Sequence, residues 1–206
     1  LARPSRRALP PSTAEQAQAF LQVVQTLQPK AKLTKRQRSV VAGWLDEPLL
    51  LVQGPPGTGK SATLGWAILN RIQLAAAAGR PCRVAVSCKT HNAIRIVLKS
   101  VVEKLEQLMR FPLPSLGAQG MPHVPLYKIV STEGDDLPRR VTPIDPHTWN
   151  PKKLEELLHQ PYLVLGSTPG GLYTLAKRRE SGDKKIDWLM NSFDLLGIDE
   201  ASQRIV

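Results

Sequence analysis

The sequence predicts an α/β fold with a mostly parallel, doubly wound sheet and helices on both of its faces. Short apolar segments typical of buried strands recur along the chain, and segments with apolar residues at helical spacing separate them. A helix between two strands returns the chain in the same direction, so the strands are expected to be parallel. The chain has 206 residues, 42% of them hydrophobic, which is enough to bury one sizeable core.

The first 30 residues are predicted to form an arm and a helix. Residues 1–11 are rich in proline and arginine, a composition typical of a linker. Ser12 and Glu15 fit a capping box, and apolar residues follow at helical spacing until Pro29. We assign residues 31–206 to one domain that is incomplete at its C-terminal end.

Apolar runs predict the strands of this domain, and apolar residues at helical spacing predict the helices. Strands are expected at residues 49–52, 83–88, 126–131, 162–167 and 194–198. Helices are expected to begin near Thr34, Lys60, Ile94 and Lys152, and a short basic helix is expected around Lys177. The segment 132–159 starts polar and proline-rich, so we expect a short insertion that forms a loop or a small surface subdomain.

Residues 49–61, LLLVQGPPGTGKS, match a phosphate-binding P-loop, G-x-x-x-x-G-K-[ST] after an apolar strand. The glycines let the backbone turn and direct N–H groups at phosphate oxygens. Lys60 supplies a positive charge for the terminal phosphates, and the Ser61 hydroxyl can ligate Mg²⁺. The sequence therefore predicts a site for ATP and Mg²⁺. The nucleotide-binding residues are expected to be Gly54, Pro55, Pro56, Gly57, Thr58, Gly59, Lys60 and Ser61.

A second element of this site is predicted at residues 193–203, FDLLGIDEASQ. An apolar strand that ends in two adjacent carboxylates is typical of a Walker B element, in which one acid binds the metal shell and its neighbour activates water. We assign Asp199 to Mg²⁺ and Glu200 to the attacking water. Taken alone, the pattern also fits a strand that ends in a solvated turn.

The charge of the chain favours a polyanionic partner in addition to ATP. Lys and Arg number 28 against 17 Asp and Glu, which gives a net charge of +11, and nucleic acid is the first candidate. A basic soluble domain without such a partner is the alternative.

The cysteines and the hydropathy of the chain indicate a reducing compartment. Cys82 and Cys88 stand on one predicted strand roughly 20 Å apart, too far for a disulfide. No apolar run approaches membrane-spanning length, and no hydrophobic signal segment is present. We expect a cytoplasmic protein with no membrane partner, and a nuclear location stays open.

Two further features indicate a family. GPPGTGKS also occurs in AAA+ ATPases, but those usually have a shorter spacing than the 139 residues from Lys60 to Asp199. They also lack a glutamine in the setting LTKRQRSVV, residues 33–41. The combination resembles the first RecA-like motor domain of superfamily 1B helicases, the group that includes the nonsense-mediated-decay RNA helicase and its DNA-acting relatives. The resemblance covers roughly residues 33–203.

The resemblance implies roles for further residues. Gln37 matches the adenine-reading glutamine of the Q motif, and Gln203 in DEASQ matches the sensor of the γ-phosphate, so catalysis is implied for Glu200, Lys60 and Gln203. SCKTHNA at 87–93 and GSTPGG at 166–171 match motifs that contact a nucleic-acid backbone. The implied contacts are Thr90, His91, Ser167 and Thr168.

Simpler explanations remain open for some of these residues. Thr34 and Gln37 also fit a capping box, which would give the glutamine a structural role. Thr90 and His91 could cap the helix that follows them, and Thr168 could belong to a tight turn.

The sequence as a whole predicts the ATP-hydrolysing motor domain of a helicase or translocase that acts on single-stranded nucleic acid. DNA is slightly favoured over RNA, because the P-loop and the TPGGLY context resemble bacterial helicases sometimes fused to RecB-like nucleases. The chain begins at Leu1 and stops six residues after Glu200. We therefore expect a fragment, poorly active alone, whose partner is a second RecA-like domain of the same polypeptide. The alternatives are an AAA+-type ATPase that remodels proteins and a non-catalytic nucleotide-binding module.

Overall fold

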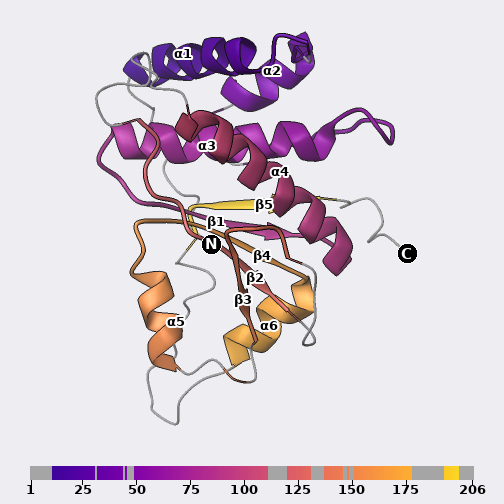
Figure 1. Ribbon diagram of the computed structural model, residues 1–206, viewed down its shortest axis with the longest axis vertical. Helices are drawn as coiled ribbons and strands as arrows, with labels where there is room; N and C mark the ends of the chain where they lie inside the picture. Colours follow the sequence, from indigo (N-terminus) through magenta and orange to yellow (C-terminus); the bar gives the residue numbers. More distant parts are fainter. Residues whose placement is uncertain are drawn as a thin grey trace.

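A five-stranded sheet forms the centre of the protein, and all of its strand pairs are parallel (Figure 1). The strand order is β3-β2-β4-β1-β5. The strands are β1 (Cys82–Ser87), β2 (Leu126–Ile129), β3 (Val141–Ile144), β4 (Tyr162–Ser167) and β5 (Leu195–Ile198). The computed structural model describes residues 11–30, 32–43, 45, 49–110, 120–130, 137–145, 148, 151–177 and 193–199.

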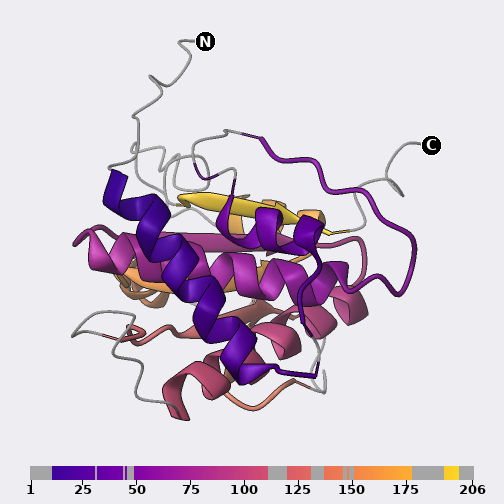
Figure 2. The ribbon, with the colours of Figure 1, turned by 90° about the horizontal axis from the view of Figure 1, so that it is seen from above.

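Helices cover both faces of the sheet, as the sequence predicts. They are α1 (Pro11–Leu27), α2 (Lys35–Ala42), α3 (Lys60–Ala77), α4 (His91–Arg110), α5 (Pro151–Leu158) and α6 (Pro169–Lys177). Helices α3 and α4 pack on one face, and α5 and α6 lie on the other (Figure 1). Helices α1 and α2 form a further layer outside α3, which Figure 2 shows from above. The α/β class and the parallel sheet are thus confirmed.

The alternation of side chains along β4 divides the core in two. Leu163 and Leu165 pack with residues of α5 and α6, and Val164 packs with the cluster of α1 to α4. In that larger cluster the ring of Phe20 meets the ring of Trp66 edge to face, with centroids 6.1 Å apart. The arm helix α1 is therefore part of the same core as the rest of the chain.

The connections of β1 and β4 leave the sheet on opposite faces. Strand β1 continues into α4 on one face, and its neighbour β4 continues into α6 on the other. In open parallel sheets, the crevice outside the carboxyl ends of two such strands is the usual place for a ligand. Residues 88–91 and 167–168 stand at the carboxyl ends of β1 and β4, and we call this position the crevice.

The strand predicted at residues 49–52 is absent, and this prediction was wrong. The segment is extended but unpaired with any described residue, and the side chain of Leu51 is 82% exposed. An apolar run becomes a strand only where a neighbouring strand accepts its backbone hydrogen bonds. In the described sheet β1 already has β4 on one side and β5 on the other, and no residue of this segment pairs with the outer side of β5.

The segment 132–159, predicted as a short insertion, contains an edge strand that the sequence analysis missed. Strand β3 pairs with β2 in parallel, with Pro143 opposite Lys128. Proline is tolerated there because β3 lies at the edge of the described sheet, where a strand needs donors on one side only.

The start of α2 and the end of α1 agree with the predictions, whereas α6 begins at Pro169, eight residues before the Lys177 around which a short basic helix was expected. Thr34 caps α2 as expected, and α1 ends before Pro29. Helix α1 begins at Pro11, so Ser12 lies in its first turn rather than at a capping position, which corrects the predicted capping box. Asn150, predicted to cap α5, lies outside the described residues.

Two properties expected from composition agree with the structure. Cys82 and Cys88 are both buried free thiols, which confirms that they do not bridge. Among the helices of the described residues, none is long and apolar enough to cross a membrane.

Candidate nucleotide-binding site

The P-loop lies at the N-terminal end of α3. Gly57 and Gly59 both have a φ of +77°, the left-handed region in which glycine carries no steric penalty. Gly59 is the N-cap of α3. The first N–H groups of a helix have no acceptor within the helix, so α3 presents donors and the positive end of its dipole to this loop. A loop of this geometry suits an anionic ligand.

The Lys60 side chain is turned onto its own loop. Its Nζ donates to the carbonyl oxygens of Gly54 at 2.7 Å and of Pro55 at 2.9 Å. The hydroxyl of Thr58 donates to the same Pro55 oxygen at 2.8 Å. Carbonyl oxygens solvate the ammonium group but carry no formal charge, so the positive charge stays available to an anion that displaces them.

The two predicted halves of the metal site are in contact. The Ser61 hydroxyl donates to Oδ2 of Asp199 at 2.8 Å, although the two residues lie 138 positions apart in the sequence. Asp199 follows β5, and its N–H donates to the Ser87 carbonyl at the end of β1 at 3.1 Å. Hydroxyl and carboxylate oxygens are ligands that Mg²⁺ prefers, so the residues present fit this ion.

Among the described residues, no group of three or more His, Cys, Asp or Glu side chains lies close enough to hold a metal. An ion at Ser61 and Asp199 would therefore take its remaining ligands from phosphate oxygens and water, which is the usual arrangement for Mg²⁺ with a nucleotide.

Gln37 joins α2 to the P-loop. Its Oε1 accepts from the Thr34 N–H at 2.8 Å, and its own N–H donates to the Thr34 hydroxyl at 3.2 Å, so the predicted capping box is confirmed. In addition, Nε2 of Gln37 donates to the Thr58 carbonyl at 3.0 Å. The Gln37 side chain therefore caps α2 and also contacts the P-loop. Whether it binds the adenine base stays a prediction.

Thr90 and Thr168 both cap helices at the crevice between β1 and β4. The Thr90 hydroxyl accepts from the Ala93 N–H at 3.1 Å, one turn into α4. The Thr168 hydroxyl accepts from the Gly171 N–H at 3.0 Å. The expected tight turn at Thr168 is the start of α6, with Pro169 as its first residue. The capping explanation is confirmed for Thr90, whereas the tight turn expected at Thr168 is corrected to a helix cap. Contact with nucleic acid remains a prediction for both residues.

The other two predicted nucleic-acid contacts differ in exposure. Ser167 is fully buried, and its hydroxyl donates to the Thr168 carbonyl at 2.9 Å. His91 is the first residue of α4 and is half-exposed. The partial exposure of Thr168 makes it a better candidate than Ser167 for contact with a large ligand.

Glu200 and Gln203, the predicted catalytic base and phosphate sensor, lie outside the described residues. The described residues therefore include the P-loop, Asp199, Gln37 and the crevice, but not the predicted catalytic base and phosphate sensor.

A polar pair behind the P-loop helix was missed by the sequence analysis. Nζ of Lys104 donates to the Ser100 hydroxyl at 2.7 Å, and that hydroxyl donates to the Ser61 carbonyl at 3.5 Å. The ammonium lies 5.4 Å from the ring centroid of Trp66. Burial lowers the pKa of Lys104, and the nearby Glu103 opposes this only in part. The signal was a lysine on the otherwise apolar face of α4.

Comparisons with known proteins leave the chain without an assigned family. No protein-family model, curated protein or solved structure matches it.

Proposed function

We propose that this chain binds Mg-ATP at the P-loop and works as the ATP-hydrolysing motor domain of a helicase or translocase on single-stranded nucleic acid. One observation carries the nucleotide part of this proposal, namely the 2.8 Å contact between Ser61 and Asp199. A P-loop sequence alone can form an ordinary turn. A P-loop serine that meets the acid at the end of a parallel strand forms a paired phosphate and metal site.

Each residue of the site has a role that its chemistry suits. Lys60 would exchange the Gly54 and Pro55 carbonyls for the terminal phosphates of ATP. Ser61 and Asp199 would hold Mg²⁺. When bound, this ion would neutralise charge on the phosphates while the terminal phosphoryl group is transferred to water. Glu200, by its place next to Asp199 in the sequence, would orient and deprotonate that water.

The nucleic-acid part rests on charge and on the topology of the sheet. The net charge of +11 favours a polyanion. Thr90 and Thr168 lie at the crevice outside β1 and β4, where hydroxyls and the first N–H groups of α4 and α6 suit contact with phosphates. Such contacts bind the nucleic-acid backbone and do not distinguish base sequence.

The experiment is an ATPase assay on the full-length protein, with and without the single-stranded DNA dT20 and the matching RNA. We expect stimulation by single strands. Glu200→Gln should retain ATP binding and cut turnover about a hundredfold, the usual scale for a general base, whereas Asp199→Asn should raise the Mg²⁺ concentration needed. Turnover unaffected by either strand would favour an AAA+-type ATPase, and ATP binding without any turnover would favour a non-catalytic module.

A further inference from the structure

Five basic residues stand close together at the start of α2 and in the segment before it. Residues 29–38 read PKAKLTKRQR and contain no Asp or Glu. We call the five cationic residues the basic segment. They are Lys30, Lys32, Lys35, Arg36 and Arg38.

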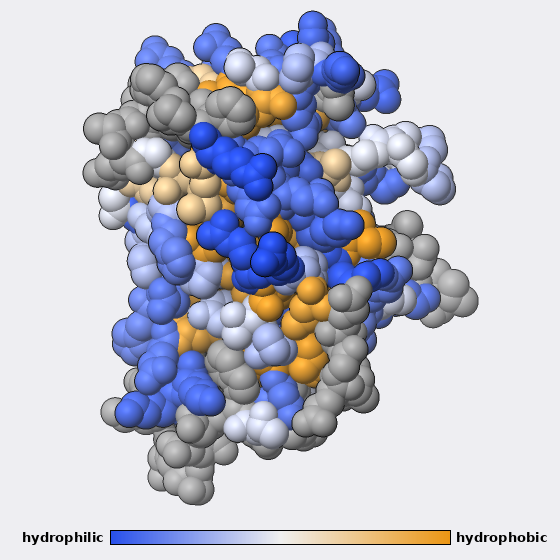
Figure 3. Space-filling view, viewed as in Figure 1, coloured by the Kyte–Doolittle hydropathy of each residue, from blue (hydrophilic) through white to orange (hydrophobic). Residues whose placement is uncertain are grey.

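All five side chains are exposed, and within the described part of the chain none of them forms a hydrogen bond or ion pair. By contrast, Lys99 on the exposed side of α4 lies 3.9 Å from Glu103. Figure 3 shows hydrophilic residues gathered over the outer layer formed by α1 and α2. The charge of the basic segment is therefore left for solvent or for a ligand.

The position of these charges does not serve the stability of α2. Lys35 and Arg36 lie in its first turn, where the positive end of the helix dipole disfavours cations, and the turn contains no acidic residue. Lys35 and Arg38 are also like charges three residues apart on the helix surface. A bound anion would relieve both unfavourable interactions.

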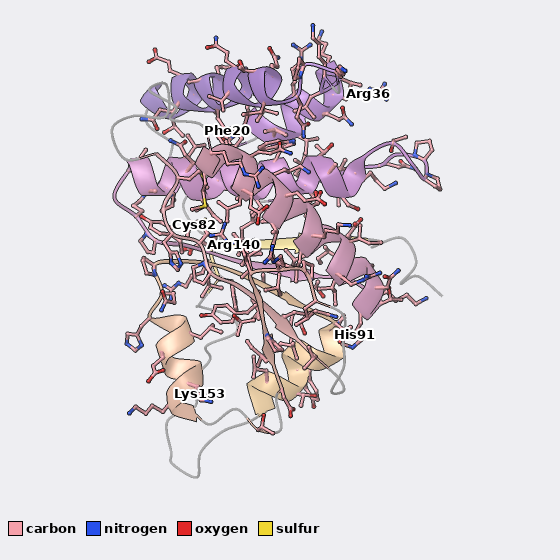
Figure 4. The ribbon with its side chains drawn as sticks, viewed as in Figure 1. Phe20, Arg36, Cys82, His91, Arg140 and Lys153 are labelled. Carbon is pink, nitrogen blue, oxygen red and sulfur yellow. The ribbon has the colours of Figure 1, made fainter. Side chains whose placement is uncertain are left out.

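The basic segment is fixed next to the P-loop. The capping box of Thr34 and Gln37 sets the first turn of α2, and Nε2 of Gln37 holds the Thr58 carbonyl at 3.0 Å. In Figure 4, Arg36 and His91 lie toward the same side of the molecule, where α3 and α4 begin. Arg36 thus lies on the side of the molecule where the P-loop meets α3.

We propose that the basic segment binds the phosphodiester backbone of single-stranded nucleic acid, as a second contact separate from Thr90 and Thr168. This inference rests on the proposed function. The five cations are spread over a linker and a helical turn rather than gathered in one pocket, which suits a chain of phosphates better than a single triphosphate. Binding at this position brings the strand up to α2, the helix that contacts the nucleotide loop.

The test compares two double charge reversals of equal size in the full chain. Arg36→Glu with Arg38→Glu alters the basic segment, and glutamate in the first turn favours the helix, so folding should be retained. Arg80→Glu with Arg139→Glu changes two exposed arginines just before β1 and β3, at the amino ends of the parallel strands and therefore away from their carboxyl ends. The measurements are the dissociation constant for dT20 over a range of salt, the affinity for Mg-ATP and the melting temperature.

We expect the first variant to bind dT20 at least tenfold more weakly, with unchanged Mg-ATP affinity. Its slope of log affinity against log salt should shrink by about 1.4, at about 0.7 per phosphate contact. The control variant should lose less than threefold. Equal losses in both variants would show an effect of net charge alone, and unchanged dT20 affinity in the first variant would also overturn the proposal.

The same data separate this proposal from the proposed function. If Thr90→Ala with Thr168→Ala weakens dT20 binding and the Arg36 and Arg38 reversal does not, only the second contact is wrong. If the unaltered chain binds Mg-ATP but not dT20, both the nucleic-acid function and the second contact fail. Binding of vesicles containing phosphatidylserine in place of dT20 would assign the basic segment to a membrane surface and overturn the proposal.

Discussion

Strand β4 and the P-loop segment are both glycine-containing and largely apolar in sequence, yet the structure holds them in opposite ways. Residues 163–167 of β4 are buried between helices on both faces of the sheet. Residues 49, 51–53 and 55–58 are exposed, and four side-chain hydrogen bonds from Gln37, Thr58 and Lys60 hold the loop. Packing defines the first region, and polar contacts that a ligand can replace define the second.

The largest effect is expected at the polar contacts. Lys60→Ala removes the only lysine side chain that donates to the loop carbonyls among the described residues, and with it the charge that we propose meets the terminal phosphates. We expect Mg-ATP affinity to fall about a hundredfold, as for a lost hydrogen bond to a charged group. Calorimetry provides the measurement, with the exposed Lys99→Ala as a control. Unchanged affinity would remove the P-loop from the proposed function.

In the packed region the sensitive residue is a glycine. A Cβ at Gly166 of β4 would lie 2.6 Å from Cγ2 of Ile94 and 2.8 Å from Cδ1 of Leu98. Gly166→Ala should therefore lower the free energy of unfolding by about 1–3 kcal/mol, measured by urea titration. Gly170→Ala is the control, because its Cβ would meet no atom closer than 4.0 Å. Equal stability of the two variants would contradict the close approach of α4 to β4.

Gln37 both caps the packed helix α2 and contacts the exposed P-loop, and two substitutions separate these roles. Gln37→Glu retains an acceptor for the Thr34 N–H but cannot donate to the Thr58 carbonyl, whereas Gln37→Ala loses both. If the amide also reads adenine, both variants should narrow the preference for ATP over GTP by about tenfold, roughly 1.4 kcal/mol. Only Gln37→Ala should lower the melting temperature.

The measurement for Gln37 is the ratio of kcat/KM for the two nucleotides in the intact protein. An unchanged ratio in both variants, with a lower melting temperature for Gln37→Ala, would leave Gln37 as a cap alone.

The smallest effect concerns Lys104, which is 5% exposed. Its pKa is lowered in the folded protein, chiefly by burial, so the native state disfavours the charged form. Lys104→Met should raise the free energy of unfolding at pH 7 by roughly 1 kcal/mol or less, because the Ser100 and Trp66 contacts offset part of the burial cost. Lys99→Met is the exposed control on the same helix.

The pH dependence gives this prediction a sign. At a pH below the lowered pKa of the folded protein, Lys104 is charged in both the folded and the unfolded state. The full free-energy cost of burying its charge is then present. As the pH rises from there toward 10.5, the native state releases its proton first, so the unaltered protein gains stability and the advantage of Lys104→Met shrinks. Urea titrations from pH 7 to 10 measure this change. An advantage that grows with pH would contradict it.

The sequence was sufficient for the packed parts of the fold. Strands β1, β2, β4 and β5 were predicted within two residues at each end, because continuous apolar runs between helices leave few alternatives. The same criterion failed at Leu49 to Val52, where composition is strand-like but no described strand accepts the backbone hydrogen bonds. It also missed β3, whose Pro143 is compatible with a strand only at a sheet edge.

For the candidate site, motif spacing predicted which residues meet but not how they are engaged. The contact of Ser61 with Asp199 follows from the expected order of strand, loop and helix. The turn of Lys60 onto Gly54 and the bond from Gln37 to Thr58 depend on tertiary distances between loops, which no periodicity encodes. The sequence could therefore predict that Ser61 and Asp199 meet, but not the contacts that Lys60 and Gln37 make with the loop.

The hydrogen bond between the Asp199 N–H and the Ser87 carbonyl has a mechanical consequence. Ser61 holds the Asp199 carboxylate, Asp199 holds Ser87, and the next N–H along, that of Cys88, donates to the Ser167 carbonyl at 3.3 Å. The carboxyl ends of β5, β1 and β4 are thus linked side by side in one row. The contact of Ser61 with Asp199 therefore lies at one end of that row, and Thr168, which follows Ser167, stands at the other.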